Sequence, residues 1–267
     1  MLSPWTQAHC NLASAYVSLD MRSEAIEAYR STLALNPNLP DAHCNLGALL
    51  RAVGDGEGAR RCYTQVIRQM PTIALAWCGL ASGLCEAGDL SAAIACYREA
   101  VRLQPSFLDA QLNLGHALKE GGWQQEAMST YMNAVAQHAN SPAAHLSLAG
   151  MQHQWRQYSL AAQSYRSALA LEPTNADTWN LLGASLREAG DVPSAILCYR
   201  TALRLRPSHE HACNNLGNAL RDQGNATEAL VCYEQVRPRA PRTARMHVHC
   251  SLRLAPLGHP HLRGGLC

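Results

Sequence analysis

Apolar residues recur along this chain with two superimposed periods, one of helical spacing and one of 34 residues. The stretch from Ala195 to Pro207 shows the short period, because its apolar side chains follow the spacing of one helix face and a proline closes it. The same phrase runs from Ala93 to Pro105, three steps of 34 residues earlier. A tyrosine occupies one position of every unit: Tyr29, Tyr63, Tyr97, Tyr131, Tyr165, Tyr199 and Tyr233. This period predicts a solenoid of stacked helix pairs rather than a single globular core.

Each unit is predicted to contain a first helix, a turn and a second helix. An alanine lies four residues before each tyrosine: Ala25, Ala59, Ala93, Ala127, Ala161, Ala195 and Ala229. The first helix has a fixed leucine: Leu12, Leu46, Leu80, Leu114, Leu148, Leu182 and Leu216. The turn glycines fit helix C-caps, which favour positive φ: Gly54, Gly88, Gly122, Gly190 and Gly224. The residue after the leucine is always alanine or glycine, which allows close helix packing. We expect the alanine of the second helix to face it and the tyrosine to fill space between units.

The 34-residue period is that of tetratricopeptide repeat (TPR) proteins. The resemblance implies an all-α right-handed superhelix of helix-turn-helix repeats. We predict an array over residues 6–236, with units at 6–39, 40–73, 74–107, 108–141, 142–175, 176–209 and 210–243, the last incomplete. Unit five departs most from the pattern, with Gln152 in place of leucine and Arg156 in place of the turn glycine. We therefore expect its junction to be the softest in the array.

The end of the chain has a different composition. Pro238 is predicted to end the last helix early, and residues 237–267 lack apolar periodicity, which predicts a disordered basic tail. Up to Glu234 the net charge is −4, and the remainder carries six arginines and no acid. Nucleic acid is therefore not an expected partner of the array. No apolar run is long enough to cross a bilayer, and no signal peptide is evident, so we expect a cytoplasmic or nuclear location.

The cysteines and histidines do not indicate metal or disulfide chemistry. Most of the 11 cysteines follow the repeat, as packing residues do, and free buried thiols suit a reducing compartment. The alternative is that some form disulfides or bind metal. The tail contains His247, His249, Cys250, His259 and His261, but their spacing lacks the pairs typical of structural zinc sites. We predict no metal and no cofactor.

Asparagine recurs immediately before the fixed leucine, on the helix that is expected to line the concave face. This asparagine ladder consists of Asn11, Asn45, Asn113 and Asn215, while Gly79, Ser147 and Leu181 fill the other ladder positions. An amide both donates and accepts, as a peptide unit does. Helices about 8–10 Å apart match three residues of extended chain at about 3.3 Å each. The ladder is therefore predicted to hold an extended polypeptide by its backbone. Alternatively, these amides bond across neighbouring helices or face water.

The repeated sequence motifs make the resemblance to a particular TPR family more specific. Asn-Leu-Gly-x-Ala-Leu, Glu-Ala-x-x-Cys-Tyr and the segment 214–224 resemble the superhelix of protein O-GlcNAc transferase. That family implies an asparagine ladder that grips substrate polypeptide, followed by a glycosyltransferase domain. Only about thirty residues follow the array here, too few for a nucleotide-binding lobe, so as written the chain is predicted not to be an enzyme. The alternative function is a fragment of such a transferase, which moves GlcNAc from UDP-GlcNAc to serine or threonine.

Further side chains are candidates for flanking contacts with a bound polypeptide. They are Asn180, Asn214, Asn218, Arg51, Lys119, Arg187 and Arg221. The four basic residues share one slot near the end of the first helix, and an acid often follows, so they are also consistent with a solvated edge. A weaker alternative is a chaperone-binding adaptor, which needs cations that converge on a carboxylate.

Overall fold

The computed structural model describes residues 4–236, which form helices joined by short turns, with no strand in that range. The first helices of the seven units are α1 (Pro4–Ser18), α3 (Pro40–Ala52), α5 (Ala74–Glu86), α7 (Leu108–Glu120), α9 (Pro142–Gln154), α11 (Ala176–Glu188) and α13 (Glu210–Asp222). The second helices are α2 (Arg22–Leu35), α4 (Gly56–Gln69), α6 (Leu90–Leu103), α8 (Gln124–Gln137), α10 (Tyr158–Leu171), α12 (Val192–Leu205) and α14 (Ala226–Val236). The predicted tail lies outside the described residues.

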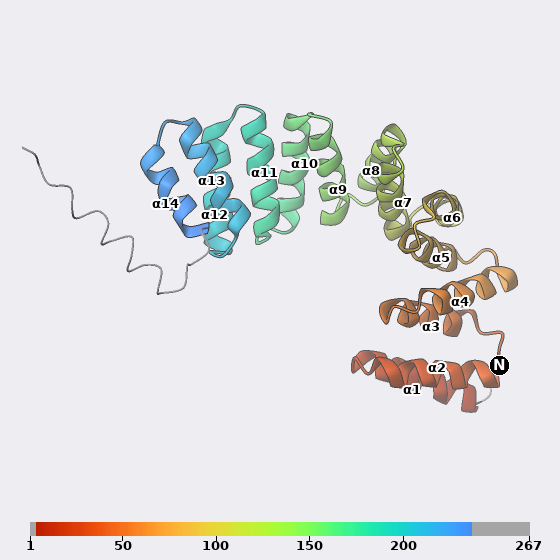
Figure 1. The fold of residues 1–267 in the computed structure, drawn as a ribbon. Helices are drawn as coiled ribbons and strands as arrows, with labels where there is room; N and C mark the ends of the chain where they lie inside the picture. Colours follow the sequence, from red (N-terminus) through yellow and green to blue (C-terminus); the bar gives the residue numbers. More distant parts are fainter. Residues whose placement is uncertain (1–3, 237–267) are drawn as a thin grey trace, which may run out of the picture.

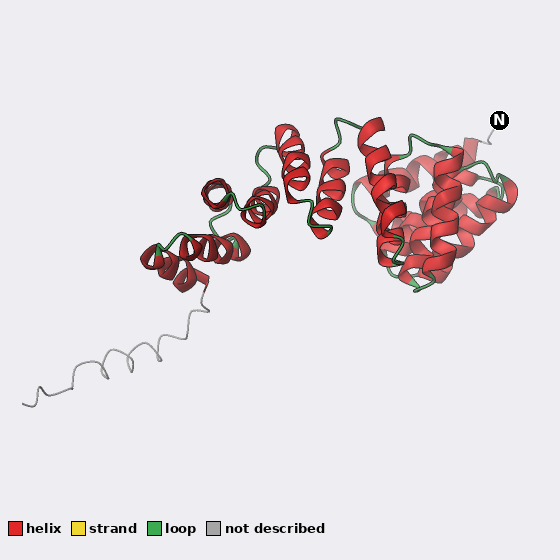
Figure 2. Ribbon diagram, turned by 90° about the horizontal axis from the view of Figure 1, so that it is seen from above, coloured by secondary structure: helices red, strands yellow, loops and turns green. Residues whose placement is uncertain are grey.

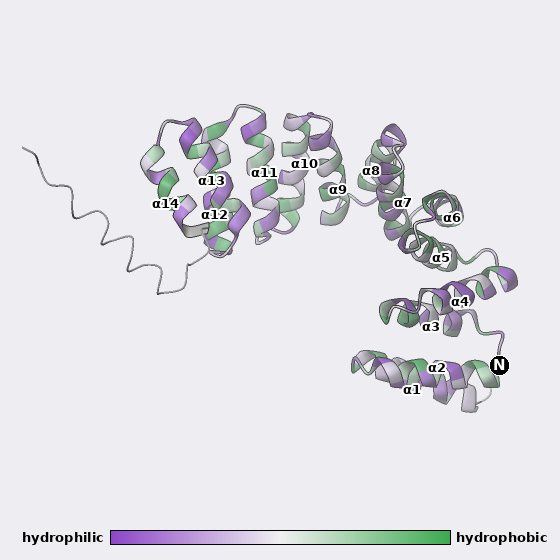
Figure 3. Ribbon diagram, in the orientation of Figure 1, coloured by the Kyte–Doolittle hydropathy of each residue, from purple (hydrophilic) through white to green (hydrophobic). Residues whose placement is uncertain are grey.

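The helix pairs follow one another in chain order along a curved array, with α1 and α14 at opposite ends (Figures 1 and 2). Hydrophobic residues are distributed over all the pairs rather than gathered in one part of the chain (Figure 3). This arrangement is the predicted all-α solenoid, in which each unit buries apolar side chains against its neighbours. None of the described helices combines the length and apolarity that crossing a membrane requires.

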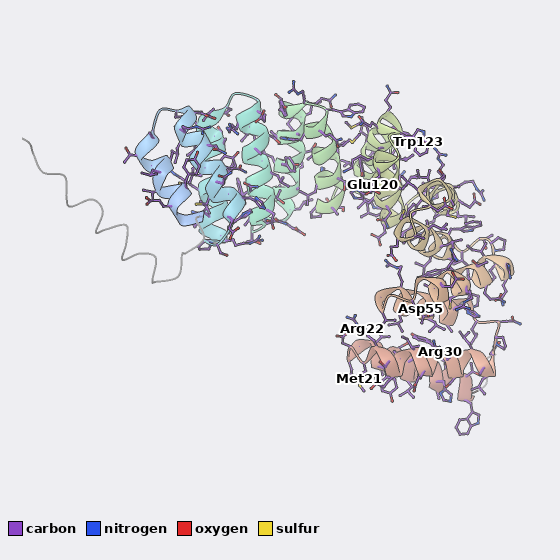
Figure 4. All side chains as sticks on the ribbon, viewed as in Figure 1. Met21, Arg22, Arg30, Asp55, Glu120 and Trp123 are labelled. Atoms are coloured by element: carbon purple, nitrogen blue, oxygen red, sulfur yellow. The ribbon has the colours of Figure 1, made fainter. Side chains whose placement is uncertain are left out.

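The turns within the helix pairs have the backbone conformation that the sequence predicts. The five turn glycines have φ between 83° and 90°. In units one and five the corresponding residues are Asp20 and Arg156, which adopt φ of 54° and 59° without being glycine. A side chain in this left-handed region is strained, so these two turns are less favourable than the other five. Figure 4 labels Met21 and Arg22, which follow the turn of unit one, and Asp55, which follows the turn of unit two.

The helices of each unit pack through the repeated alanine and tyrosine. The alanine is buried in all seven units, with at most 2 % of its surface exposed. The small residue after the leucine, however, faces the tyrosine ring of its own unit: a Cβ on Gly115 would lie 2.4 Å from Tyr131 Cε1, and one on Gly183 would lie 2.7 Å from Tyr199 Cε1. The expectation that the second-helix alanine faces this small residue, while the tyrosine fills space between units, is therefore corrected. The tyrosine fills the space within a unit as well as between units.

The junction between α8 and α9 has the least extensive helix packing of the six junctions between units, only slightly less than the α2–α3 and α6–α7 junctions. Most second helices begin at an aspartate or asparagine whose side chain accepts a backbone N–H, as Asp89 does for α6. Met21, Trp123 and Gln157 take that position before α2, α8 and α10 and provide no such cap. Missing caps cost about 1 kcal/mol each, but these positions lie within units, whereas α9 itself begins after Ser141, whose side chain accepts the Ala144 N–H. The softness of the junction therefore stays a prediction.

Candidate functional site

The first helices lie on the inner side of the curved array. Those of neighbouring units contact each other directly, as α3 does α5 and α11 does α13, whereas no pair of second helices packs to a comparable extent. In a curved stack the elements on the inside of the curve are the closer ones. The ladder positions are therefore on the helices that line the concave side, as the sequence predicts.

Two of the ladder asparagines are open to solvent. Asn11 on α1 is exposed, and its Oδ1 accepts a hydrogen bond from Gln7 Nε2 of the same helix at 3.0 Å. Asn45 on α3 is also exposed, and within the described residues its side chain has no hydrogen-bond partner. Asn45 therefore presents a complete donor and acceptor set to the inner surface.

The other two ladder asparagines are tied to the preceding unit. Asn215 Nδ2 donates to Asn180 Oδ1 at 2.9 Å, which links α13 to α11. Asn113 is hydrogen-bonded to the thiol of Cys78, which links α7 to α5. The bonding between neighbouring helices that the sequence left open as an alternative is thus present at both positions. Each amide keeps unused capacity, since the Asn215 Oδ1 and its second N–H remain available.

The ladder positions without asparagine have different surroundings. Gly79 has no room for a side chain, because a Cβ there would lie 2.3 Å from Tyr63 Cζ. Leu181 is an exposed apolar residue, 43 % accessible, and Ser147 is half-buried. The sequence showed that these positions depart from the pattern, but it gave no reason for the departure at Gly79.

The flanking amides are divided between structural contacts and solvent. Asn180 is buried as the partner of Asn215. Asn218 Oδ1 accepts a hydrogen bond from the Tyr233 hydroxyl at 2.8 Å, and Asn214 is exposed. Of the three, Asn214 is the most accessible to a ligand.

The row of basic residues forms ion pairs between units. Arg51 Nη1 lies 2.9 Å from Glu86 Oε1, and Arg187 Nε lies 2.9 Å from Asp222 Oδ2, each in the next unit. The acid of the next unit hydrogen-bonds each guanidinium and raises its pKa. Arg221 lies 3.9 Å from the same aspartate. These pairs lower the net positive charge that a carboxylate-binding site would need.

Lys119 is the exception in this row. The residue at the place of the next unit's acid is Gln154, and Lys119 forms no ion pair within the described residues. It is half-buried at the end of α7. The row therefore has one unneutralised cation in the middle of the array.

The cysteines on the inner helices are buried thiols. Burial raises the pKa of Cys44 and of Cys78 to about 11, and for Cys78 the hydrogen bond from Asn113 opposes the shift. Such thiols are inert at neutral pH. Within residues 4–236, no group of three or more potential ligand side chains is placed to hold a metal ion. The histidines of the tail lie outside the described residues.

Family models match a large part of the chain. One, described as TPR repeat, matches residues 23–54 and 84–122, and another, described as tetratricopeptide repeat, matches residues 155–210 and 180–244. The chain belongs to the tetratricopeptide repeat family. TPR proteins generally mediate interactions between proteins, and an all-helical repeat fold is typical of scaffolds without enzymatic activity. No curated protein matches this TPR chain.

Solved structures share the fold. The C-terminal part of a TPR repeat-containing protein from Cytophaga hutchinsonii aligns with a TM-score of 0.69 at 15 % identity, over 87 % of this chain and 97 % of that one. PilF of Pseudomonas aeruginosa aligns with a TM-score of 0.67 at 20 % identity, over 78 % and 94 %. YrrB, described as a TPR protein with an unusual peptide-binding site, aligns with a TM-score of 0.58 at 19 % identity, over 70 % and 96 %. At these identities the likeness shows the fold alone.

Proposed function

We propose that this TPR array is a protein-interaction scaffold that holds an extended polypeptide along its concave side through the backbone of the bound chain. The observation that carries the proposal is the exposed amide of Asn45, which has no partner among the described side chains and lies on an inner helix. A polar side chain that is already satisfied gains little from a ligand, whereas a free amide can donate to and accept from one peptide unit.

The spacing of the ladder supports an extended ligand. Packed helices lie about 8–10 Å apart, and three residues of extended chain cover about the same distance. Consecutive ladder positions would therefore meet every third residue of a bound strand. Asn113 and Asn215 contribute through the capacity that their bonds to the preceding unit leave free. The flanking residues Asn214 and Lys119 are proposed to contact side chains of the ligand.

The transferase fragment is a second candidate, favoured by the repeated phrases and by the asparagines at matching positions. The family models and the solved structures give no support for it beyond the TPR fold. Sequencing the native transcript beyond the codon for Glu234 tests it. A reading frame that continues into a sugar-nucleotide transferase domain would support this candidate, and a stop after Cys267 would reject it.

The chaperone-adaptor alternative is the weakest of the three. It requires cations that converge on a terminal carboxylate, whereas Arg51 and Arg187 are already paired with acids of the next unit. An adaptor would also lose affinity when the C-terminus of its ligand is amidated, which a backbone-binding groove would not.

The test uses one polypeptide in two conformations. Fluorescein-labelled α-lactalbumin is prepared both native and as its reduced, carboxymethylated, unfolded form, and binding is measured by fluorescence anisotropy. We expect the unfolded form to bind and the native form not to bind. Asn45→Ala combined with Asn113→Ala should weaken binding by about tenfold, because each lost hydrogen bond contributes roughly 0.5–1.5 kcal/mol.

Two controls separate binding from folding. Asn133→Ala removes an exposed asparagine from the second helix α8 and should leave the affinity unchanged. Circular dichroism should show equal helicity in all variants. Equal binding of both lactalbumin forms, or unchanged affinity in the double variant, would contradict the proposal.

A further inference from the structure

A cavity of about 360 Å³ lies between α10 and α12, on the outer side of the array because both of its walls are second helices. These two helices and α11 follow one another along the array (Figure 1), and α11 packs against both. The floor of this outer cavity is formed by Trp179, Leu182 and Leu186 of α11. Trp179 Nε1 already donates to the Pro173 carbonyl at 2.9 Å, so the indole offers the cavity apolar surface alone.

The outer cavity is open because small side chains face it from both walls. They are Ala170 on α10 and Ser194 on α12. At the next junction, 34 residues later, the same two positions hold the longer Arg204 and Glu228. Leu197 of α12 also lines the cavity and is 63 % exposed, so the apolar surface continues past the rim. The volume lies within the range of about 300–1,000 Å³ that is typical of ligand sites.

The rim of the outer cavity carries an arginine that lacks the partner found at other junctions. At two of them an arginine of one second helix donates from Nη2 to a glutamate Oε1 28 residues later: Arg98 to Glu126 at 2.8 Å, and Arg200 to Glu228 at 2.5 Å. Arg166 occupies the equivalent position on α10, but the residue 28 positions later is Ser194. Within residues 4–236, Arg166 forms no ion pair and is exposed. A free guanidinium therefore lies beside the apolar floor.

Asp191 does not take the place of the missing glutamate. The pKa of Asp191 is lowered, first by its hydrogen bonds to Ser194 and to a lesser degree by the charge of Arg166. Its Oδ1 accepts the Ser194 N–H at 3.2 Å as the cap of α12, and it makes no contact with Arg166 within the 4.0 Å of an ion pair. Arg166 keeps its hydrogen-bonding capacity for an external carboxylate.

We propose that the outer cavity binds a short amphipathic helix of a partner protein, which inserts an apolar side chain between α10 and α12 and pairs an acidic side chain with Arg166. The apolar floor selects the first group, and charge complementarity selects the second. This site uses none of the ladder residues, so it adds a second binding surface to the concave one.

The apolar floor favours a helical ligand over an extended one. A helix satisfies its own backbone hydrogen bonds, whereas a strand laid on Leu182, Leu186 and Leu197 would leave backbone groups without partners. Side chains three or four positions apart on a helix lie about 5–6 Å from each other, so one turn can present both an apolar and an acidic group. Grooves between packed helices also accept the side-chain ridges of another helix.

The probe is a fluorescein-labelled designed peptide of about five helical turns, with leucine along one face and glutamate on both flanks. Two peptides serve for comparison. One has the same composition in a scrambled order that is not amphipathic, and the other has lysine in place of each glutamate. We expect fluorescence anisotropy to show binding of the acidic amphipathic peptide and of neither comparison peptide.

Two variants remove the free charge in different ways. Arg166→Gln deletes it, and Ser194→Glu supplies the glutamate that pairs with the arginine at the other junctions. Each should weaken binding of the acidic peptide by about tenfold. Ser194 is the third residue of α12, where glutamate is favourable, so the urea midpoint of Ser194→Glu should stay the same or rise. Ala170→Phe, which fills the cavity from its wall, should also weaken binding.

Arg204→Gln is the matched control, since it removes an exposed arginine of α12 that does not line the cavity. Its affinity should lie within about twofold of the parent chain. Equal binding of the scrambled peptide, no binding of any peptide, unchanged affinity in Arg166→Gln or Ala170→Phe, or equal loss in Arg204→Gln would overturn the inference.

The two binding surfaces can fail separately. Asn45→Ala with Asn113→Ala should leave the affinity for the acidic peptide unchanged, and Ser194→Glu should leave binding of unfolded α-lactalbumin unchanged. Loss of acidic-peptide binding in the asparagine double variant would place this peptide on the concave side and contradict the assignment to the outer cavity.

Discussion

Tyr63 is held between two glycines, and this arrangement makes the substitution Gly79→Ala a sharp test of the packing. A Cβ on Gly79 would lie 2.3 Å from Tyr63 Cζ and 2.4 Å from Cε1, and one on Gly47 would lie 2.9 Å from Cζ on the neighbouring inner helix. Optimal carbon contacts are about 3.5–4.0 Å. The added methyl would therefore overlap the ring by more than about 1 Å, and the ring has little room to retreat.

The expected magnitude follows from two opposing terms. Overpacking a well-packed core costs about 1–3 kcal/mol, and the depth of this overlap places it near about 3 kcal/mol. Replacing glycine within a helix gains about 1 kcal/mol of helix propensity. We expect Gly79→Ala to lower the free energy of unfolding by about 2 kcal/mol in urea titrations followed by circular dichroism.

A glycine of the same helix provides the control. Gly83 lies four residues further along α5, and a Cβ there would meet no atom within 4 Å. Gly83→Ala should therefore stabilise the chain by about 1 kcal/mol. In a Tyr63→Leu background the penalty of Gly79→Ala should largely disappear, since neighbouring residues couple. A Gly79→Ala variant as stable as Gly83→Ala would refute the reasoning.

Three further outcomes follow from strain, packing and buried thiols. Arg156→Gly should raise the free energy of unfolding by about 1 kcal/mol, because it relieves the positive φ, whereas Gly190→Ala at the equivalent turn should lower it; equal effects would contradict this. Amides flanking the α8–α9 junction should exchange faster than those of the other junctions, and uniform protection along the array would count against a soft point there. Burial raises the thiol pKa of Cys44, Cys78 and Cys198 from 9.0 to about 11. Because the folded state favours the protonated thiols, their contribution to the free energy of unfolding is complete below pH 9 and is lost as the pH rises through about 11. Urea midpoints that do not change between pH 8 and 10.5 would exclude this contribution.

The architecture could be predicted from the sequence because the same helix-turn-helix pattern of residues recurs in all seven units. The 34-residue period predicted the helix pairs, and the turn glycines and the prolines after the second helices predicted where helices end. The observed helix ends and positive φ angles agree with these predictions. Arg156 was identified from the sequence as a departure, and its backbone does adopt the glycine conformation. Such features depend on local chemistry, which a single sequence contains.

The details of the candidate site depend on contacts between units, which the sequence does not contain. The sequence placed Asn113 and Asn215 in the ladder, but it could not show that each bonds to the unit before it. It related the basic residues to the acids that follow them directly, whereas Arg51 pairs with Glu86, 35 residues later. The tilt of the Tyr63 ring onto Gly79 likewise depends on how neighbouring helices stack.

The most direct test of the proposed function is the affinity of the single variant Asn45→Ala for unfolded α-lactalbumin. This asparagine has no partner to lose in the free protein, so its removal should leave the unfolding midpoint unchanged and affect binding alone. We expect a roughly three- to tenfold weaker affinity than that of the parent chain and of Asn133→Ala. An affinity equal to theirs would contradict the claim that amides of the inner helices hold the backbone of a bound polypeptide.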